Sequence, residues 1–269
     1  MAIKQWKNFL VPYQQAVDEL KIKFKSIRKE FKYRNEYSPI EFVTGRVKEI
    51  SSILEKIKKF SIPIEKIEYE LEDIAGIRIM CQFVDDITKV VNIIRKRKDM
   101  SIIYEKDYVT NAKESGYRSY HIIIKYPVNL SLGCKEIIAE LQIRTLGMNF
   151  WATAEHSLNY KYKQLIPSNL KDKLKQTADA AYQLDELMMQ IKDEIKDAQR
   201  LFEVKSHIVS NINENLISLI SLGKVKESSN YQLQLTALIE IGDINQLNSL
   251  LLSIQRDIDR YKNNKASEN

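Results

Sequence analysis

The chain has 269 residues, of which 44% are hydrophobic and 29% are charged. This balance predicts a folded globular protein and excludes an intrinsically disordered one. The formal net charge of +6 suits anionic ligands, but the abundant acidic residues mean that charge alone does not establish nucleic-acid binding.

No apolar run reaches membrane-spanning length, and the first eight residues lack the apolar core of a secretory signal. Cys81 and Cys134 lie far apart in apolar stretches of sequence, so reduced packing thiols are expected, with a disulfide only if the fold joins them. The sequence therefore predicts a cytoplasmic protein without membrane contact.

Residues 3–35 are expected to form one long helix. Apolar residues recur there every three or four positions, and the opposite face is rich in lysine and arginine. Lys21 and Lys25 lie one helical turn apart, so the two ammonium groups could hold one phosphate group together. A solvated basic face explains the same lysines equally well.

A strand over 40–48 and a helix over 49–60 follow. Cationic and hydroxyl side chains converge along this unit, which makes it a candidate polyphosphate cradle without a glycine-rich loop; they are Arg46, Lys48, Ser52, Lys56 and Lys59. Asp73 comes just before a strand over 76–82, a typical position for a magnesium ligand. A cap or turn aspartate is the simpler explanation of that residue.

A helix over 85–98 and three further strands, over 101–108, 117–126 and 137–144, complete the expected sheet. Because side chains alternate along a strand, Glu140, Gln142 and Arg144 share one face that could hold a polar ligand. A charged edge strand is the alternative. Tyr117 follows Gly116 at a strand mouth, where its ring could stack on a nucleobase, although a core or edge tyrosine is commoner.

The remaining chain is helical in pattern. A helix is expected over 146–162, and another runs from Ser168 to about Val204 with a heptad seam of apolar residues between Leu174 and Ala198. The seam predicts packing against another helix of this chain or of a neighbouring subunit. Residues 207–261 also read as helices, without recognisable chemistry, and the last residues are expected to be disordered.

Four segments occur together in one order: D-I-A-G-I-R-I (73–79), G-Y-R-S-Y-H (116–121), E-L-Q-I-R-T (140–145) and M-N-F-W-A-T-A-E-H (148–156). With these segments the chain resembles the RelA/SpoT-type synthetase domain over about residues 10–205, and more closely the small alarmone synthetases of the RelQ kind. The resemblance implies a synthetase domain over 1–205 that includes oligomerisation helices at both ends. It leaves a helical extension over 206–262 of unknown role and a disordered tail over 263–269.

The implied fold is α+β, a mixed five-stranded sheet flanked by helices and related to nucleotidyltransferase folds. The implied reaction transfers pyrophosphate from ATP to the 3′-hydroxyl of GDP or GTP, which gives ppGpp or pppGpp and releases AMP, with Mg²⁺ as cofactor. The long forms of the family hydrolyse alarmone through a histidine–aspartate metal domain. Since this chain has three histidines and no His-Asp dipeptide, no hydrolase activity is expected.

The resemblance also implies roles for individual residues. Arg46 and Arg78 would hold the adenine, and the ATP phosphates would be held by Lys48, Ser52, Lys56 and Lys59. Asp73 and Glu140 would bind magnesium, with Glu140 also the general base. Tyr117 would stack on guanine near Gln142 and Asn149. The acceptor's phosphates would be held by Lys106, Lys113 and His121; Lys106 departs from the arginine that is frequent there, which keeps the charge but loses the bidentate fork.

Relatives of the RelQ kind are tetramers whose central cleft binds pppGpp as an activator. The matching positions are Lys21, Lys25, Phe42 and Thr44, which turns the basic first helix into a candidate effector site. Single-stranded RNA is a weaker candidate ligand of the same cleft. Two other functions stay open: a toxic relative that pyrophosphorylates adenine nucleotides or the 3′ end of tRNA, and a catalytically silent RNA-binding module.

Overall fold

The computed structural model describes residues 3–161, 167–241 and 243–267. Its internal contacts divide the chain into two compact units, Met1–Gln190 and Ile191–Asn269. This division falls earlier than the boundary expected near residue 205, and both positions lie within one helix, Ser168–Ser221. No helix in the described ranges is long and apolar enough to cross a membrane.

The first unit alternates helices and strands. Its elements in chain order are α1 (Ile3–Tyr33), β1 (Phe42–Val47), α2 (Ile50–Phe60), a 3₁₀ turn (Ile64–Lys66), α3 (Ile67–Glu70), β2 (Ala75–Cys81), α4 (Val84–Arg95), β3 (Ser101–Asp107), β4 (Tyr120–Leu130), β5 (Gly133–Thr145), α5 (Leu146–Lys161) and the first part of α6 (Ser168–Ser221). Every helix and strand expected in this part of the sequence is present, with ends that differ by a few residues.

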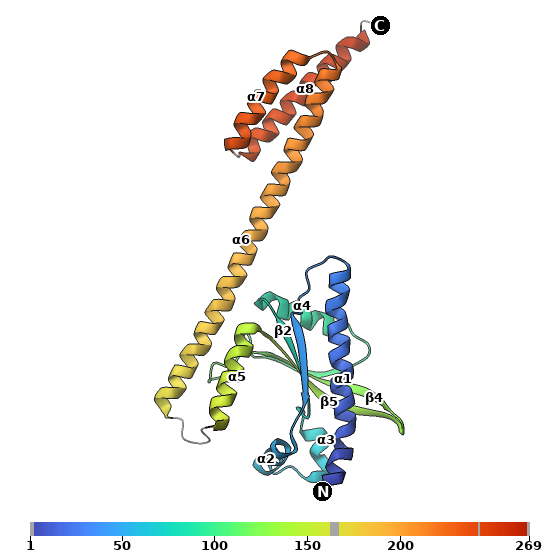
Figure 1. The fold of residues 1–269 in the computed structure, drawn as a ribbon, viewed down its shortest axis with the longest axis vertical. Coiled ribbons are helices and arrows are strands. Elements are labelled where there is room, and N and C mark those ends of the chain that lie inside the picture. The colour runs from blue at the N-terminus through green and yellow to red at the C-terminus, as the bar shows by residue number, and fades with distance from the viewer. Residues whose placement is uncertain (1–2, 162–166, 242, 268–269) are drawn as a thin grey trace. The chain divides into compact units, whose positions relative to one another are not determined.

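The five strands form one sheet in the order β1-β2-β5-β4-β3 (Figure 1). β2 and β5 are parallel, and the other three neighbouring pairs are antiparallel. The expectation of a mixed five-stranded sheet in an α+β fold is therefore confirmed. The parallel pair brings β2 beside the long strand β5, although paired residues such as Ala75 and Ala139 lie 64 positions apart in the chain.

α1 covers the apolar face of this sheet. The stripe expected on its sequence is buried, with Tyr13, Leu20 and Phe24 at 1% exposure or less. It packs against strand side chains such as Ile77 and Leu141, which are also fully buried. Figure 1 shows α1 running along the sheet, across several strands. Apolar burial on this face leaves the opposite face free for polar side chains.

β4 differs from the expected strand at both ends. It begins at Tyr120 because the backbone before it turns: Gly116 has a φ of 88°, and its N–H donates to the carbonyl of Lys113 over 2.8 Å. It continues past Pro127 to Leu130, paired only with β5, since its pairing with β3 ends at Lys125. A proline lacks the N–H that a second neighbour would need, so it is tolerated at this edge.

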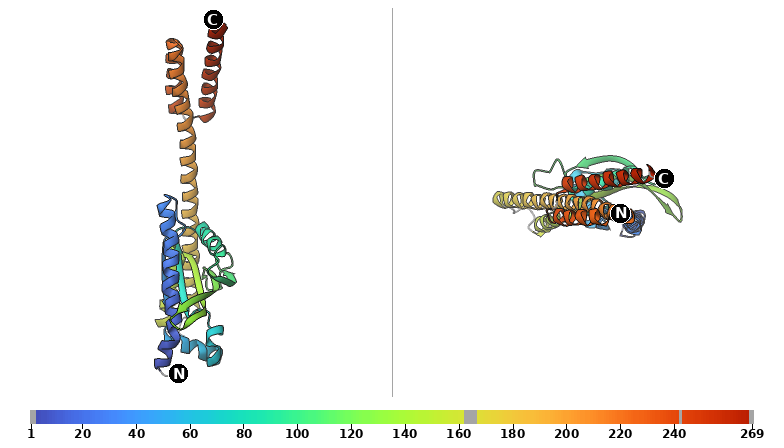
Figure 2. Two further views of the ribbon diagram at one scale, coloured as in Figure 1. Left: turned by 90° about the vertical axis from the view of Figure 1, so that its right-hand side faces the viewer. Right: turned by 90° about the horizontal axis from the view of Figure 1, so that it is seen from above.

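The second unit is a small helical bundle with its own core. α7 (Val225–Ile241) and α8 (Ile244–Ser267) pack with the last part of α6 around Ile212, Leu235 and Ile254 (Figure 2). α6 extends well beyond Val204, to Ser221. The tail expected to be disordered over 263–269 is helical as far as Ser267; residues 268–269 lie outside the described part.

The heptad seam of α6 is largely exposed. Leu184 is 57% exposed and Ile195 is 54% exposed. Packing of the seam against a neighbouring subunit stays a prediction. Of the two cysteines, Cys81 is buried, as expected, whereas Cys134 is exposed in the hairpin between β4 and β5 and is not a packing thiol.

Candidate active site

The face of the sheet opposite α1 collects polar side chains from all five strands. In the β-ladder, Arg46 pairs with Gly76, Gly76 with Glu140, and Arg78 with Gln142. Gln142 also pairs with His121, and His121 pairs with Lys106. Paired residues on neighbouring strands point to the same side. The register therefore gathers side chains that the sequence predicted for ATP, metal and acceptor on one surface.

Two cavities in this surface meet at a pair of carboxylates. The first has a volume of about 230 Å³, and Arg46, Arg78 and Gln142 are among its lining residues. The second has a volume of about 440 Å³, with Lys56 among its lining residues. Asp73 and Glu140 line both cavities. The fold thus brings together two carboxylates that lie 67 residues apart in the sequence.

Asp73 is held by two lysines of the expected phosphate cradle. Its Oδ2 accepts hydrogen bonds from Lys48 Nζ over 2.6 Å and from Lys56 Nζ over 2.7 Å. Burial alone would raise the pKa of Asp73, but these two bonds outweigh burial and lower the pKa below its usual value. Its Oδ1 is buried and has no hydrogen-bond partner among the described residues.

The orphaned oxygen of Asp73 fits a hard cation. A buried carboxylate oxygen without a partner is costly. An oxygen-ligated divalent ion between Asp73 and Glu140 would remove that cost, and carboxylates are the ligands that Mg²⁺ prefers. No group of three or more His, Cys, Asp or Glu side chains suited to a metal occurs among the described residues, so nucleotide phosphates would have to complete the coordination.

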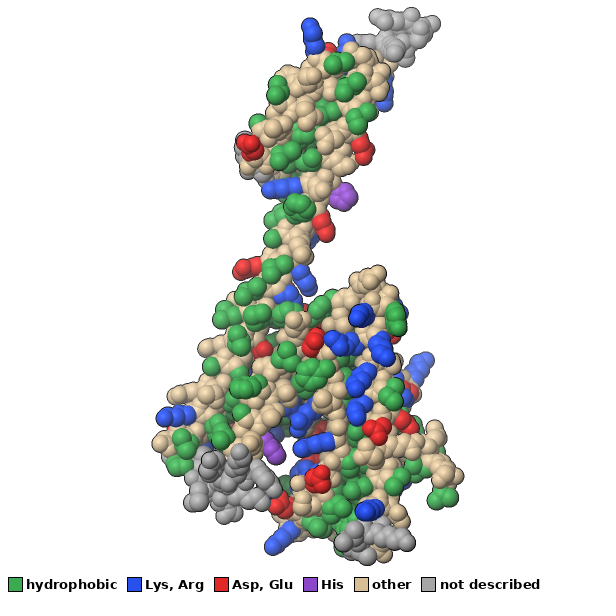
Figure 3. Space-filling view, in the orientation of Figure 1, with side chains coloured by type: hydrophobic (Ala, Val, Ile, Leu, Met, Phe, Trp, Pro, Cys, Tyr) green, Lys and Arg blue, Asp and Glu red, His purple; other side chains and the backbone are tan. Residues whose placement is uncertain are grey.

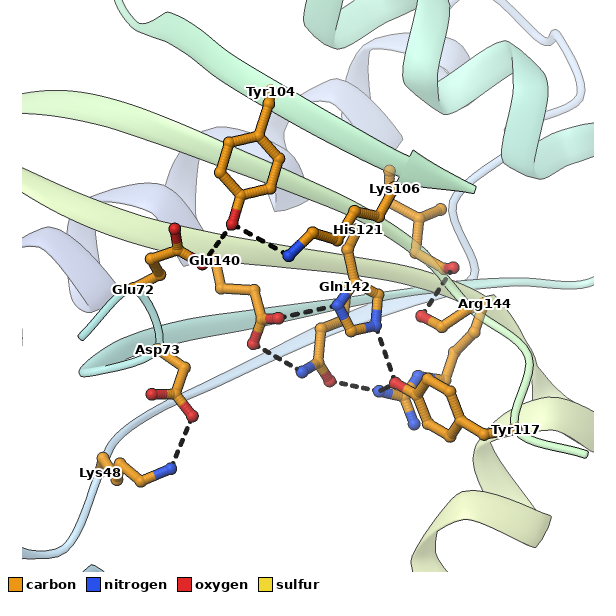
Figure 4. A network of polar contacts seen from close by, with 12 residues as sticks. Lys48, Glu72, Asp73, Tyr104, Lys106, Tyr117, His121, Glu140, Gln142 and Arg144 are labelled. Carbon is orange, nitrogen blue, oxygen red and sulfur yellow. Dashed lines mark hydrogen bonds and ion pairs between the residues drawn. The ribbon is translucent and has the colours of Figure 1, made fainter. Parts of the chain in front are cut away.

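Glu140 accepts a hydrogen bond on each carboxylate oxygen (Figure 4). His121 Nδ1 lies 2.8 Å from Oε1, and Gln142 Nε2 donates to Oε2 over 2.8 Å. Burial would raise the pKa of Glu140, but the bonds from His121 and Gln142 outweigh it and lower the pKa. The carboxylate is therefore held ionised and in one orientation, as a proton acceptor requires.

Tyr117 lies beside this carboxylate, at the entry to β4. Its hydroxyl is 2.8 Å from Nε2 of His121. Lys113 Nζ lies 5.0 Å from the centroid of the Tyr117 ring and 4.6 Å from that of Tyr108. The structure therefore places Lys113 and the ring expected to stack on guanine together. The pairing of β4 with β5 sets His121 next to Glu140, and its expected contact with the acceptor's phosphates stays a prediction.

The other expected site residues lie around this centre. Lys106 Nζ donates to the hydroxyl of Tyr104 over 3.2 Å. Lys59 is exposed beside Phe60, with its Nζ 5.4 Å from the ring centroid. Ser52 and Asn149 are both half-buried, on α2 and α5 respectively.

The four candidate effector residues lie on two neighbouring elements, α1 and β1, and the Lys21 side chain packs over Gly45, the residue after Thr44. Lys21 and Lys25 lie on α1, which covers the apolar face, while Thr44 lines the first cavity on the other face. Phe42 pairs with Met80 and is 40% exposed on the edge strand β1. Figure 3 shows Lys and Arg side chains gathered over α1 and the neighbouring edge of the sheet.

Sequence reasoning missed Glu72 as a member of the site and left the partners of Arg144 open. Glu72 lines the second cavity and accepts a hydrogen bond from the hydroxyl of Tyr104. The position of Glu72 next to Asp73 was the available signal, but nothing in the sequence pairs it with Tyr104. Arg144, which the sequence placed on one face with Glu140 and Gln142, bonds to Gln142 and Tyr117.

Comparison with known proteins agrees with this geometry. Residues 45–165 match the family model described as the region found in RelA/SpoT proteins. The chain is 54% identical over 202 residues to the GTP pyrophosphokinase YjbM of Bacillus subtilis, across 75% of this chain and 95% of YjbM. The chain belongs to the RelA/SpoT family. Within that family it is a small alarmone synthetase and a GTP pyrophosphokinase.

Solved structures of this family share its fold. Small alarmone synthetase 1 of Bacillus subtilis bound to its product pppGpp superposes with a TM-score of 0.69 at 55% identity, over 71% of this chain and 98% of that one. The same synthetase bound to AMPCPP gives a TM-score of 0.64 at 50% identity, over 72% of this chain and 98% of that one. About a quarter of this synthetase therefore lies outside what these relatives share.

Proposed function

We propose that this synthetase transfers pyrophosphate from ATP to the 3′-hydroxyl of GDP or GTP at the carboxylate pair Asp73 and Glu140. The observation that carries the proposal is the meeting of two cavities at these carboxylates, with a pair of arginines in the wall of the first. Such a site can hold a donor and an acceptor nucleotide with their reacting groups together. The relatives solved with AMPCPP and with pppGpp support both ligand classes.

ATP occupies the side of β1, α2 and β2. The guanidinium planes of Arg46 and Arg78 suit stacking against adenine from either side. The triphosphate lies along Lys48, Lys56 and Lys59, whose ammonium groups neutralise its charge, and the Ser52 hydroxyl donates a hydrogen bond to it. Lys48 and Lys56 are preorganised for this role, since Asp73 already holds both.

Mg²⁺ bound by Asp73 and Glu140 would neutralise phosphate charge and align the transferred group. Glu140 takes the proton of the 3′-hydroxyl. The hydroxyl oxygen forms a bond to the β-phosphorus of ATP, the bond from that phosphorus to the α–β bridging oxygen breaks, and AMP leaves with that oxygen. Tyr117 stacks on guanine near Asn149 and Gln142, and the acceptor's phosphates lie by Lys106, Lys113 and His121.

An acceptor panel tests this assignment. Pure protein with Mg²⁺ and ATP labelled in the β-phosphate is incubated separately with GDP, GTP, AMP and tRNA. Label is expected in ppGpp and pppGpp and not in the other two products. Transfer only to AMP or tRNA would favour the toxic relatives, and no transfer at all would favour a silent RNA-binding module.

Replacing the base tests its role. Glu140→Gln keeps the size and one acceptor oxygen but cannot take a proton at neutral pH. We expect its kcat to fall by about 10²- to 10⁴-fold, the usual contribution of a positioned base. A turnover equal to that of the wild type would show that Glu140 is not the base.

We propose further that pppGpp activates the enzyme at Lys21, Lys25, Phe42 and Thr44. The proposed site lies where α1 and the edge strand β1, which carry these residues, face neighbouring subunits of a homotetramer. Lys25→Ala is expected to abolish stimulation by added pppGpp while leaving basal turnover unchanged, since Lys25 lies outside the catalytic face. Equal stimulation of both proteins would refute the effector site. Single-stranded RNA is a second candidate for the same basic surface, and its addition to this assay tests it.

A further inference from the structure

Five side chains of the candidate active site form a closed ring of hydrogen bonds (Figure 4). Its links join Glu140 to His121, His121 to Tyr117, Tyr117 to Arg144, Arg144 to Gln142, and Gln142 back to Glu140. Every hydrogen bond of the ring can be assigned a donor and an acceptor, and the donation runs from Arg144 toward Glu140. Arg144 Nη2 donates to both Tyr117 and Gln142. From there two arms lead to Glu140: one runs from Tyr117 through His121 to Oε1, and the other runs through Gln142 to Oε2.

In each arm, the bonding partners determine which group donates and which accepts. Tyr117 Oη lies 3.3 Å from Arg144 Nη2 and 2.8 Å from His121 Nε2, so it accepts from the arginine and donates to the imidazole. His121 then carries its proton on Nδ1, where the Glu140 carboxylate accepts it. In the other arm, Gln142 accepts through its oxygen and donates through its nitrogen. The amide orientation follows from these two partners.

Arg144 is unusual for a cation in this position. Its side chain is only 3% exposed, and in the described ranges no carboxylate lies within ion-pair distance of it. Its Nε is buried without a partner among the described residues. A buried charge without a counter-ion costs stability. Among the described residues, the contacts of its guanidinium are the Tyr117 hydroxyl, the Gln142 amide oxygen and the Tyr117 ring, whose centroid lies 5.6 Å from Cζ. These contacts indicate a role in holding Tyr117 and Gln142.

We propose that Arg144 is a positioning residue that sets Tyr117 and Glu140 in one geometry, so that guanine stacking and proton acceptance are aligned by a single side chain. This inference rests on the proposed function, which supplies the roles of these two residues. Arg144 itself touches no reacting atom. Its planar guanidinium reaches both acceptors at once, which the shorter and more mobile lysine ammonium does not reproduce.

Kinetics of two single variants and their double variant test the proposal. Tyr117→Phe keeps the aromatic ring and removes the hydroxyl, whereas Arg144→Lys keeps the charge and removes the fork. Each is expected to lower kcat by about 10- to 100-fold, the scale of loss for an active-site group misplaced by about 1 Å. For Tyr117→Phe, the KM for GDP is expected to stay within about threefold of the wild type, because the stacking surface is retained.

The double variant separates a ring from two independent contacts. Both changes break the link between Arg144 and Tyr117. The kcat of the double variant is therefore expected to lie within about threefold of that of the less active single variant. Arg118→Lys is the matched control. Arg118 donates to the carbonyl of Val109, and its Cζ lies 3.9 Å from the centroid of the Tyr182 ring. Because Arg118 lies outside the hydrogen-bonded ring, the kcat of Arg118→Lys should equal that of the wild type.

Three outcomes would overturn the proposal. They are wild-type kcat in Arg144→Lys, multiplicative losses in the double variant, and a Tyr117→Phe variant that changes only the KM for GDP. If Arg144→Lys does not fold, the kcat and the KM for GDP of Tyr117→Phe test the proposal by themselves. A wild-type protein and an Arg118→Lys control that make no ppGpp or pppGpp would instead refute the proposed function, so the two failures are distinguishable.

Discussion

At the scale of single residues, the fold assigns opposite environments to residues of one chemical type. Cys81 lies at the end of β2, fully buried, and Cys134 is exposed at the hairpin. Burial raises the pKa of the Cys81 thiol well above its usual value, with a smaller contribution from nearby carboxylates. A neutral buried thiol is a poor nucleophile, since the thiolate is the reactive form.

This difference predicts the reactivity of the thiols. One equivalent of thiol per chain is expected to react with a water-soluble disulfide reagent in the native state, and two in denaturant. Cys134→Ser should remove the native reaction and leave one slow equivalent that appears on unfolding. Fast reaction of two thiols in the folded protein would contradict the burial of Cys81. The measurement is the absorbance of the released chromophore.

At the scale of elements, the approach of α1 to β1 determines how the edge of the active site is supported. Gly45 lies directly under the helix: an added Cβ would lie 2.8 Å from Ile77 Cδ1 and 3.0 Å from Val17 Cγ1. Close packing therefore requires glycine here.

At the other end of the site, Thr145 Oγ1 accepts from the N–H of Met148 and donates to Asp185 of α6, which attaches α6 to the start of α5.

Gly45→Ala should consequently push α1 away from the sheet. The overpacking is expected to destabilise the first unit by about 1–3 kcal/mol. Gly76→Ala is the matched control on the neighbouring strand, because its added Cβ meets only the carbonyl of Arg46 at 3.8 Å, an ordinary contact. Denaturant unfolding of both variants measures the difference. Equal stability of the two would show that α1 adjusts without strain.

At the scale of the whole molecule, two units with separate apolar cores share one chain. Separate cores favour separate unfolding transitions, so one free energy of unfolding does not describe the protein. The proposed catalytic residues all belong to the first unit. The described residues that line the two cavities at the carboxylate pair lie between Thr44 and Gln142, within the first unit.

Ile254→Ala tests this independence. Ile254 is fully buried in the core of the second unit, so the change should destabilise that unit by about 2–5 kcal/mol. Leu252→Ala, on the same helix at 52% exposure, should have little effect. Calorimetry is expected to show one transition shifted in Ile254→Ala and the other in place, with wild-type pyrophosphokinase turnover. A shift of both transitions would show that the units unfold together.

The sequence by itself determined the local features, because they depend on periodicity along a single segment. Alternation placed Glu140, Gln142 and Arg144 on one face of β5, and the three- and four-residue spacing of α1 identified the buried stripe. The resemblance of four segments to the RelA/SpoT family supplied the reaction, which the periodicities alone left open.

Only the tertiary structure decided which segments meet. The parallel pairing of β2 with β5 brings Asp73 to Glu140, and the register of β4 against β5 gives His121 its two partners. The role of Arg144 depends on Tyr117, which lies 27 residues earlier and precedes β4, although the sequence predicts it as the first residue of that strand. Such contacts depend on strand order and register, which are set by packing of the whole sheet against α1 and not by any one segment.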